Sequence, residues 1–240
     1  MIVEVCANSL ASALNAQKAG ANRIELCSEL AVGGITPSYG LLKAVKEQIS
    51  IPVHVLIRSR SGDFTYSKDD YEIMKEDIAH CVDLGFQGIV TGVLHQNFTV
   101  DLERTAALKE QSKGLKFTFH RAFDWVDDPM GTFDQLEAMG ADYILTSGQR
   151  NAAIEGIELL ADLHRKASKC IIMPGGGIRP ANVHSFKEIG FKAIHLSGID
   201  FDRTLLQAPK VSMNSPSFLK DDEIGVSSME TIQKILHEVK

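Results

Sequence analysis

Short apolar runs alternate with longer amphipathic segments along almost the whole chain. The apolar runs are rich in Val and Ile and fall at residues 2–6, 23–27, 53–58, 88–92, 115–120, 142–146, 170–174 and 193–197. Segments of helical period lie near residues 9–19, 38–49, 68–84, 102–112, 129–139, 152–167, 180–189 and 227–239. A run of the first kind predicts a strand and a segment of the second kind predicts a helix, so the chain repeats a strand–helix unit.

Glycines mark the ends of several predicted helices. Gly20, Gly85, Gly140 and Gly190 each follow a helical segment and precede a strand, where a left-handed residue commonly ends a helix. Strand–helix units in series predict a parallel sheet, and closing that sheet into a barrel removes its exposed edges. An open doubly wound sheet also alternates, but it usually has fewer strands. We therefore expect an α/β protein with one domain over residues 1–240, folded as a (β/α)8 TIM-type barrel.

One long segment departs from this rhythm. Residues 199–226 separate the eighth strand from the last helix without a clear period. A loop of this length in a compact domain is often functional. Because it follows a strand end directly, we expect an irregular segment that lies as a flap beside the site, or alternatively a packed surface excursion.

Composition and charge narrow the function classes. The chain has 240 residues, of which 44% are hydrophobic, and its net charge is −6. An acidic balance gives no electrostatic reason to bind nucleic acid or an anionic membrane. The N-terminus shows no export signal, and the four cysteines form no C-x-x-C pair. These features predict a cytoplasmic protein with reduced thiols.

The alternation of side chains along each strand predicts which residues face the barrel interior. Val3 and Val5 suit the helix-facing side of the first strand, which leaves Glu4 and Cys6 inward. The same argument directs Arg23, Glu25, Cys27, His54, Arg58, Thr118, His120, His195 and Ser197 inward.

Several of these polar residues lie at the carboxyl ends of strands, where barrel enzymes place their sites. Carboxylates and imidazoles are the usual proton-transfer groups. The catalytic candidates are therefore Glu4, Glu25, His120, Asp124 and His195. The alternative is that Glu and Arg side chains form buried pairs that have no chemical role.

Small residues after three strands predict an anion site. Backbone N–H groups in glycine loops suit an oxyanion, and barrels often hold phosphate after strands seven and eight. Arginines bind carboxylate and phosphate oxygens with paired donors. The anion-binding candidates are Arg58, Arg60, Ser147, Gly148, Gly175, Gly176, Gly177, Ser197 and Gly198. Alternatively, the glycines serve only tight turns, and the arginines neutralise Glu4, Glu25 or Asp63.

Two cysteines fall at equivalent ends of neighbouring strands. Cys6 and Cys27 both point inward, and adjacent strands lie about 4.8 Å apart, so their sulfurs could approach each other. Paired soft thiolates suit Cu(I), although buried cysteines often act as small hydrophobic residues. Cys81 and Cys170 lie in a predicted helix and at the start of a predicted strand, and we expect them to be structural.

Six ordered segments resemble the CutC copper homeostasis family. They are 23–27 (RIELC), 33–38 (GGITPS), 62–67 (GDFTYS), 88–94 (GIVTGVL), 118–124 (TFHRAFD) and 145–149 (LTSGQ). The resemblance implies a TIM-type barrel, a cytoplasmic location, a homodimer or higher homo-oligomer, and a role in copper tolerance. The copper proposal for the family rests on cysteines, and Cys6 and Cys27 stand in the matching strand-end segments.

Two functional hypotheses follow. The first is a copper homeostasis protein that binds Cu(I) through Cys6 and Cys27 without turnover. The second is a TIM-barrel enzyme that acts by acid–base chemistry on a small phosphorylated or otherwise anionic metabolite. The expected ligand is thus a copper ion or a small anion. The residues do not decide whether a reaction is catalysed.

Overall fold

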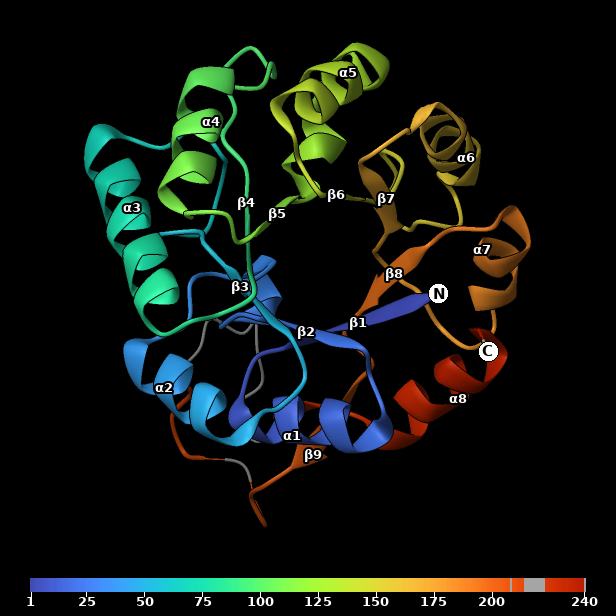
Figure 1. Cartoon of the computed structure of the whole chain (residues 1–240). Helices are drawn as coiled ribbons and strands as arrows, with labels where there is room; N and C mark the ends of the chain where they lie inside the picture. Colours follow the sequence, from blue (N-terminus) through green and yellow to red (C-terminus); the bar gives the residue numbers. More distant parts are fainter. Residues whose placement is uncertain (208, 214–222, 240) are drawn as a thin grey trace.

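Eight parallel strands surround a central axis, and helices form an outer ring around them (Figure 1). This arrangement comes from a computed structural model that describes residues 1–207, 209–213 and 223–239. The barrel strands are β1 (Ile2–Ala7), β2 (Arg23–Leu26), β3 (Val53–Leu56), β4 (Gly88–Thr91), β5 (Lys116–Phe119), β6 (Tyr143–Thr146), β7 (Ile171–Pro174) and β8 (Ala193–Leu196).

The strand order confirms the predicted barrel. Neighbours pair in the order β7-β6-β5-β4-β3-β2-β1-β8, and each of these pairs is parallel. A parallel bridge between Gly175 and His195 joins the two end strands, so the sheet closes on itself. Closure brings the carboxyl ends of all eight strands to one rim.

The helices begin and end where the sequence carries the appropriate residues. They are α1 (Leu10–Ala19), α2 (Tyr39–Gln48), α3 (Lys68–Asp83), α4 (Leu102–Gln111), α5 (Pro129–Met139), α6 (Ile157–Lys166), α7 (Val183–Ile189) and α8 (Met229–Val239). Two 3-10 turns, η1 (Leu30–Val32) and η2 (Arg121–Trp125), follow β2 and β5. Gly20, Gly140 and Gly190 end α1, α5 and α7 with φ of 97°, 86° and 89°, as predicted.

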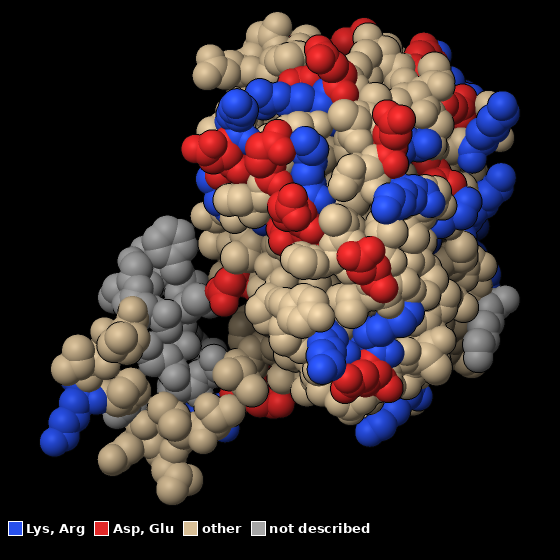
Figure 2. All heavy atoms as spheres, turned by 60° about the vertical axis from the view of Figure 1, so that its left-hand side comes forward, with Lys and Arg blue, Asp and Glu red and all other residues tan. Residues whose placement is uncertain are grey.

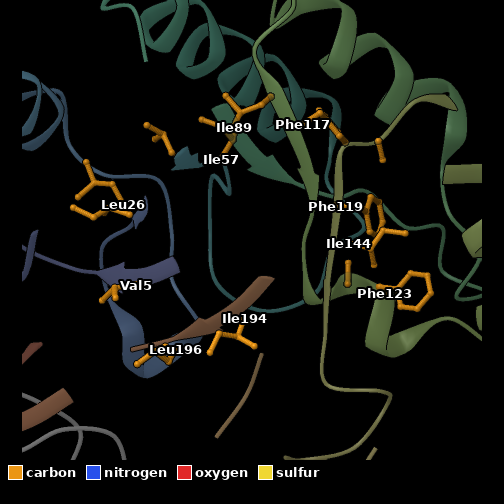
Figure 3. Close-up of a cluster of buried hydrophobic side chains, with 14 of the residues drawn as sticks. Val5, Leu26, Ile57, Ile89, Phe117, Phe119, Phe123, Ile144, Ile194 and Leu196 are labelled. Atoms are coloured by element: carbon orange, nitrogen blue, oxygen red, sulfur yellow. The ribbon is translucent and has the colours of Figure 1, made fainter. Parts of the chain in front are cut away.

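The main hydrophobic core lies between the barrel and its helices. Side chains from alternate strand positions, such as Val5, Ile89 and Phe117, are fully buried there (Figure 3). Because side chains alternate along a strand, the remaining positions fill the barrel itself. Inside, one small apolar cluster contains Cys6, Cys27, Leu56 and Val90, and a second contains Tyr143, Leu145, Met173 and Ala193.

The prediction for residues 199–226 was wrong at both ends of the segment. Strand β9 (Ile199–Arg203) pairs with strand β10 (Glu223–Ser227) in an antiparallel two-stranded sheet. The amide N–H of Ser227 donates to Ser12 Oγ at 3.1 Å, which ties β10 to α1. Two separated stretches form this sheet, so local periodicity could not reveal the pairing. Residues 208 and 214–222 lie outside the described part, and the proposed flap stays a prediction.

The distribution of charge on one face and the character of the described helices narrow the classes of partner. On the face in Figure 2, acidic and basic side chains are interspersed, without the continuous basic surface that nucleic acids require. Among the described residues, none of the helices combines the length and the apolar character needed to cross a lipid bilayer.

Candidate functional site

A buried network of charged side chains occupies the middle of the barrel. Glu4 on β1 lies opposite Arg23 on β2, and Arg23 Nε donates to Glu4 Oε2 at 2.5 Å. His195 on β8 contacts the same carboxylate, with Nδ1 2.8 Å from Glu4 Oε1. The other ring nitrogen, Nε2, lies 3.4 Å from Glu25 Oε2. The predicted inward residues of three adjacent strands therefore meet within hydrogen-bond or ion-pair distance.

The charges in this network shift each other's pKa values. Burial alone would raise the pKa of Glu4, but Arg23 and His195 outweigh it and hold that pKa at about 2. Burial would lower the pKa of His195, whereas Glu25 and Glu4 raise it above its usual value. The pKa of Glu25 is raised, chiefly by burial and further by the charge of Glu4. A protonated imidazole suits this geometry because both ring nitrogens then donate to carboxylates.

The two predicted thiols meet at the carboxyl end of β1 and β2. Cys6 Sγ lies 3.4 Å from Cys27 Sγ, although the backbone register places Cys6 opposite Glu25. Both cysteines are buried, with exposed fractions of 5% and 0%. The sulfur of Cys6 also groups with one carboxylate oxygen of Glu25 and one nitrogen of His195, all within 4.8 Å of one another. A soft sulfur, a borderline imidazole nitrogen and a hard carboxylate oxygen are thus gathered in one place.

Neither of the two thiols forms a disulfide in this structure. The hydrogen-bonded neighbour Cys27 and burial raise the pKa of Cys6 well above its usual range. Without a metal, Cys6 is therefore a neutral thiol at physiological pH. A metal ion would have to displace that proton, because the thiolate is the ligand.

Arg58 and His120 do not join this network, and they lie instead under the loop that follows β3. The guanidinium of Arg58 donates to the carbonyl oxygens of Val32, Gly34 and Gly62 at 2.6–2.9 Å. Its charge clamps two loops, and only Nε remains without an acceptor among the described residues. An anion ligand was expected here from the sequence, but backbone carbonyl groups accept from most of the donors of Arg58.

His120 is held as a neutral imidazole. Burial and the nearby charge of Arg58 lower its pKa to about 3. Its Nδ1 accepts from the amide of Ala122 at 3.2 Å, so the proton resides on Nε2. The ring of Phe64 packs against both residues. Its centroid lies 4.8 Å from the centroid of the His120 ring and 5.0 Å from Arg58 Cζ.

Arg60 lies on the surface rather than at the rim centre. It pairs with Asp63 and Asp70 at 3.1 Å each, and 36% of its side chain is exposed. The sequence left open whether Arg60 binds an anion or pairs with a carboxylate of the protein. This geometry favours the pairing of Arg60 with Asp63.

Asp124 organises the loop after β6. Its carboxylate accepts hydrogen bonds from the Thr146 hydroxyl, the Ser147 amide and hydroxyl, the Gln149 amide and Arg121 Nε. Only 7% of the side chain is exposed. So many donors leave Asp124 little capacity to serve as the proton-transfer group that the sequence suggested.

Arg121 is a functional candidate that was not among the residues expected from the sequence. Its Nε donates to Asp124 at 2.7 Å and its NH2 donates to Ser147 Oγ at 2.8 Å. A Cβ atom at Gly176 would lie 3.5 Å from the Arg121 guanidinium, so β5, β6 and β7 contribute to one spot. The available signal was its position, one residue beyond His120 at a strand end.

Ser197 and Gly198 follow β8 directly. The carbonyl oxygen of Gly198 accepts a hydrogen bond from the amide of Ser228 at 2.7 Å.

Comparisons with known proteins agree with this architecture. The sequence profile of the CutC family matches residues 1–200. A family protein CutC from Photorhabdus laumondii is 47% identical over 81% of this chain and 79% of its own length. A relative of the same name from Proteus mirabilis is 41% identical over 97% of this chain and 96% of its own. The crystal structure of CutC from Streptococcus agalactiae superposes with a TM-score of 0.78 at 36% identity, covering 82% of this chain and 98% of that one.

Proposed function

The chain belongs to the CutC family, and from this premise we propose that it serves copper homeostasis by binding Cu(I) at Cys6 and Cys27. The similar protein from Streptococcus agalactiae is named for copper homeostasis. The observation that carries the proposal is the 3.4 Å approach of the two buried sulfurs.

The chemistry of the donors favours a soft ion. Thiolates select Cu(I) over harder cations, and Cu(I) tolerates the low coordination number that two sulfurs provide. A disulfide is the competing use of a close thiol pair. Cys6 pairs with Glu25 in the parallel register, so Cys27 lies diagonally across the strand pair. Diagonal partners have Cα atoms about 7–8 Å apart, at or beyond the limit for an unstrained disulfide.

His195 and Glu25 supply the remaining polar groups of the site. A nitrogen of His195 and an oxygen of Glu25 lie within 4.8 Å of the Cys6 sulfur. Imidazole nitrogen suits copper as a ligand, but it must first lose the proton that the carboxylates stabilise. We expect His195 to modulate the thiol site, while Glu4 holds the imidazole in place.

Removal of the two sulfurs tests the proposal. We expect the double variant Cys6→Ser/Cys27→Ser to lose at least about 100-fold in Cu(I) affinity, because hydroxyl groups are poor ligands for a soft ion. The measurement is an anaerobic competition titration against a Cu(I) chelator. The control is Cys81→Ser/Cys170→Ser, which removes two buried cysteines outside the site and should leave the affinity unchanged. Equal affinity of the wild type and the first variant would refute the thiol site.

The raised pKa of Cys6 makes the affinity depend on pH. Because the thiol is protonated at neutral pH and the thiolate is the ligand, metal binding releases a proton. We expect Cu(I) affinity to rise about tenfold per pH unit for each proton released, up to the thiol pKa. The same titration at pH 6, 7 and 8 measures the slope. A flat profile would show that no thiol proton is displaced.

We also propose a cytoplasmic location for this activity. All four cysteines are free and buried, and reduced thiols persist in the cytosol but not in oxidising compartments.

A further inference from the structure

Three arginines line the barrel rim on the side away from the thiols. Arg121, Arg150 and Arg179 lie in the connections that follow β5, β6 and β7, respectively. Neither Arg150 nor Arg179 pairs with a carboxylate within the described part of the chain, and both are exposed. Arg121 is paired with Asp124, so Arg150 and Arg179 are the two of these rim arginines that carry a positive charge without a carboxylate partner among the described residues.

The guanidinium of Arg121 is held in a fixed orientation. Asp124 accepts from its Nε and Ser147 Oγ accepts from its NH2. NH1 has no acceptor in the described residues, and it lies 3.5 Å from the position that a Cβ atom at Gly176 would take. The carboxylate of Asp124 accepts four further hydrogen bonds from Thr146, Ser147 and Gln149, which fix its position beside Arg121.

The backbone opposite Arg121 presents unused donors. Gly176 and Gly177 adopt φ of 105° and 71°, which side chains rarely tolerate. Within the described residues, neither amide N–H finds an acceptor. A Cβ atom at Gly176 would also lie 3.3 Å from Ser147 Cβ, so the glycine keeps the space beside the guanidinium open. Successive backbone amides next to a fixed guanidinium form an anion-binding arrangement.

We propose that this rim binds a phosphate oxyanion through Arg121 NH1 and the amides of Gly176 and Gly177, with Arg150 and Arg179 adding long-range attraction. The site lies after β5–β7, whereas the thiols lie after β1 and β2, so the two sites are separate. Of the glycines that the sequence predicted for an anion site, Gly176 and Gly177 take part in it, and Arg121 takes the place of Arg58 and Arg60 as its cation. The same donors would bind inorganic phosphate or the phosphate group of a phosphomonoester. The two ligands differ in whether the organic part of the ligand adds to the affinity.

Isothermal titration of the full chain tests this site with two probes, inorganic phosphate and glycerol 3-phosphate. We expect Arg121→Gln to weaken the binding of either probe by about 10–100-fold, because a charged hydrogen bond is lost. The matched control is Arg165→Gln on α6, which removes the same charge from an exposed pair with Asp162 and should bind as the wild type does. Tighter binding of glycerol 3-phosphate than of phosphate would identify a phosphomonoester as the ligand class, and equal binding would identify phosphate itself.

Two outcomes would overturn the proposal: no binding of either probe by the wild type at millimolar concentration, or equal loss in Arg121→Gln and Arg165→Gln. Circular dichroism checks that Arg121→Gln is folded. If it is not folded, the double variant Arg150→Gln/Arg179→Gln is tested instead, because both side chains are exposed and their replacement should not disturb the fold. The phosphate affinity of this variant must fall, and it must depend less on salt concentration than the affinity of the wild type does. The thiol variant Cys6→Ser/Cys27→Ser should bind phosphate normally, so failure of the copper site and failure of this site are distinguishable.

Discussion

Replacement of Arg23 by methionine is expected to lower the free energy of unfolding by about 3–5 kcal/mol, because the buried Glu4 carboxylate then keeps only the His195 imidazole, which it shares with Glu25. Glu4 is fully buried, and Arg23 is its closest partner at 2.5 Å. Arg23 also lies 4.2 Å from the centre of the Tyr143 ring and donates to the sulfur of Met173 at 3.4 Å. Methionine keeps much of the apolar contact and removes the charge. Urea unfolding at pH 7 measures the effect.

The double variant Glu4→Gln/Arg23→Met separates an unpaired charge from lost packing. If the charge dominates, this variant is more stable than Arg23→Met, since removal of both ions leaves no uncompensated carboxylate. An equal loss in the single and double variants would point to packing instead.

The pH dependence of the wild type has a defined sign. Glu4 has its pKa lowered from 4.5 to about 2 in the folded protein, so the folded state binds fewer protons than the unfolded state between these values. Its contribution to stability is complete above the unfolded pKa and is lost as pH falls from about 4.5 towards 2. The difference between wild type and Arg23→Met should therefore shrink in this range. A difference that stays constant down to pH 2 would contradict the assignment.

Replacement of Asp124 by alanine is expected to cost about 3–4 kcal/mol, because several donors from two loops lose one shared acceptor. Among these donors are the buried hydroxyl of Thr146, at 2.5 Å, and the amide of Ser147, at 2.9 Å. Thermal unfolding measures the loss. We also expect phosphate affinity to fall with it, since Arg121 would no longer be oriented.

A second aspartate on the same stretch of chain provides the control. Asp128 caps α5 by accepting from the amide of Gly131 at 2.9 Å, a single bond whose loss typically costs about 1 kcal/mol. Asp128→Ala should therefore be clearly milder than Asp124→Ala. Comparable losses would mean that the hydrogen bonds of Asp124 contribute little beyond one cap.

The strands and the faces of their side chains could be predicted because period-two alternation is a strict geometric rule. Val3 and Val5 lie among the helix-facing core, whereas Glu4 and Cys6 face inward, as parity required. The approach of Cys6 to Cys27 followed from the same rule together with the spacing of adjacent strands. Properties set by regular backbone geometry were thus accessible from the sequence.

The partners of loop residues could not be predicted, because loop conformation decides them. Arg58 was expected to contact an anion, but the loops after β2 and β3 turn their carbonyl groups towards its guanidinium. Asp124 was expected to be a proton-transfer group. In the structure its carboxylate accepts five hydrogen bonds, from Arg121, Thr146 and the loop after β6. Arg121 went unnoticed because its neighbour Gly176 lies 55 residues further along the sequence.

Glu4 and Cys6 stand two positions apart on β1, and both depend on how that strand is aligned with β2. A shift by one residue would turn both side chains towards the helices at once. The ion pair that stabilises the barrel and the thiol pair proposed for copper therefore both depend on the register of β1 with β2. A one-residue insertion between Glu4 and Cys6 would place them on opposite faces of β1, so one of the two pairs would be lost, whereas substitution of Cys6 alone removes the thiol and leaves the register unchanged.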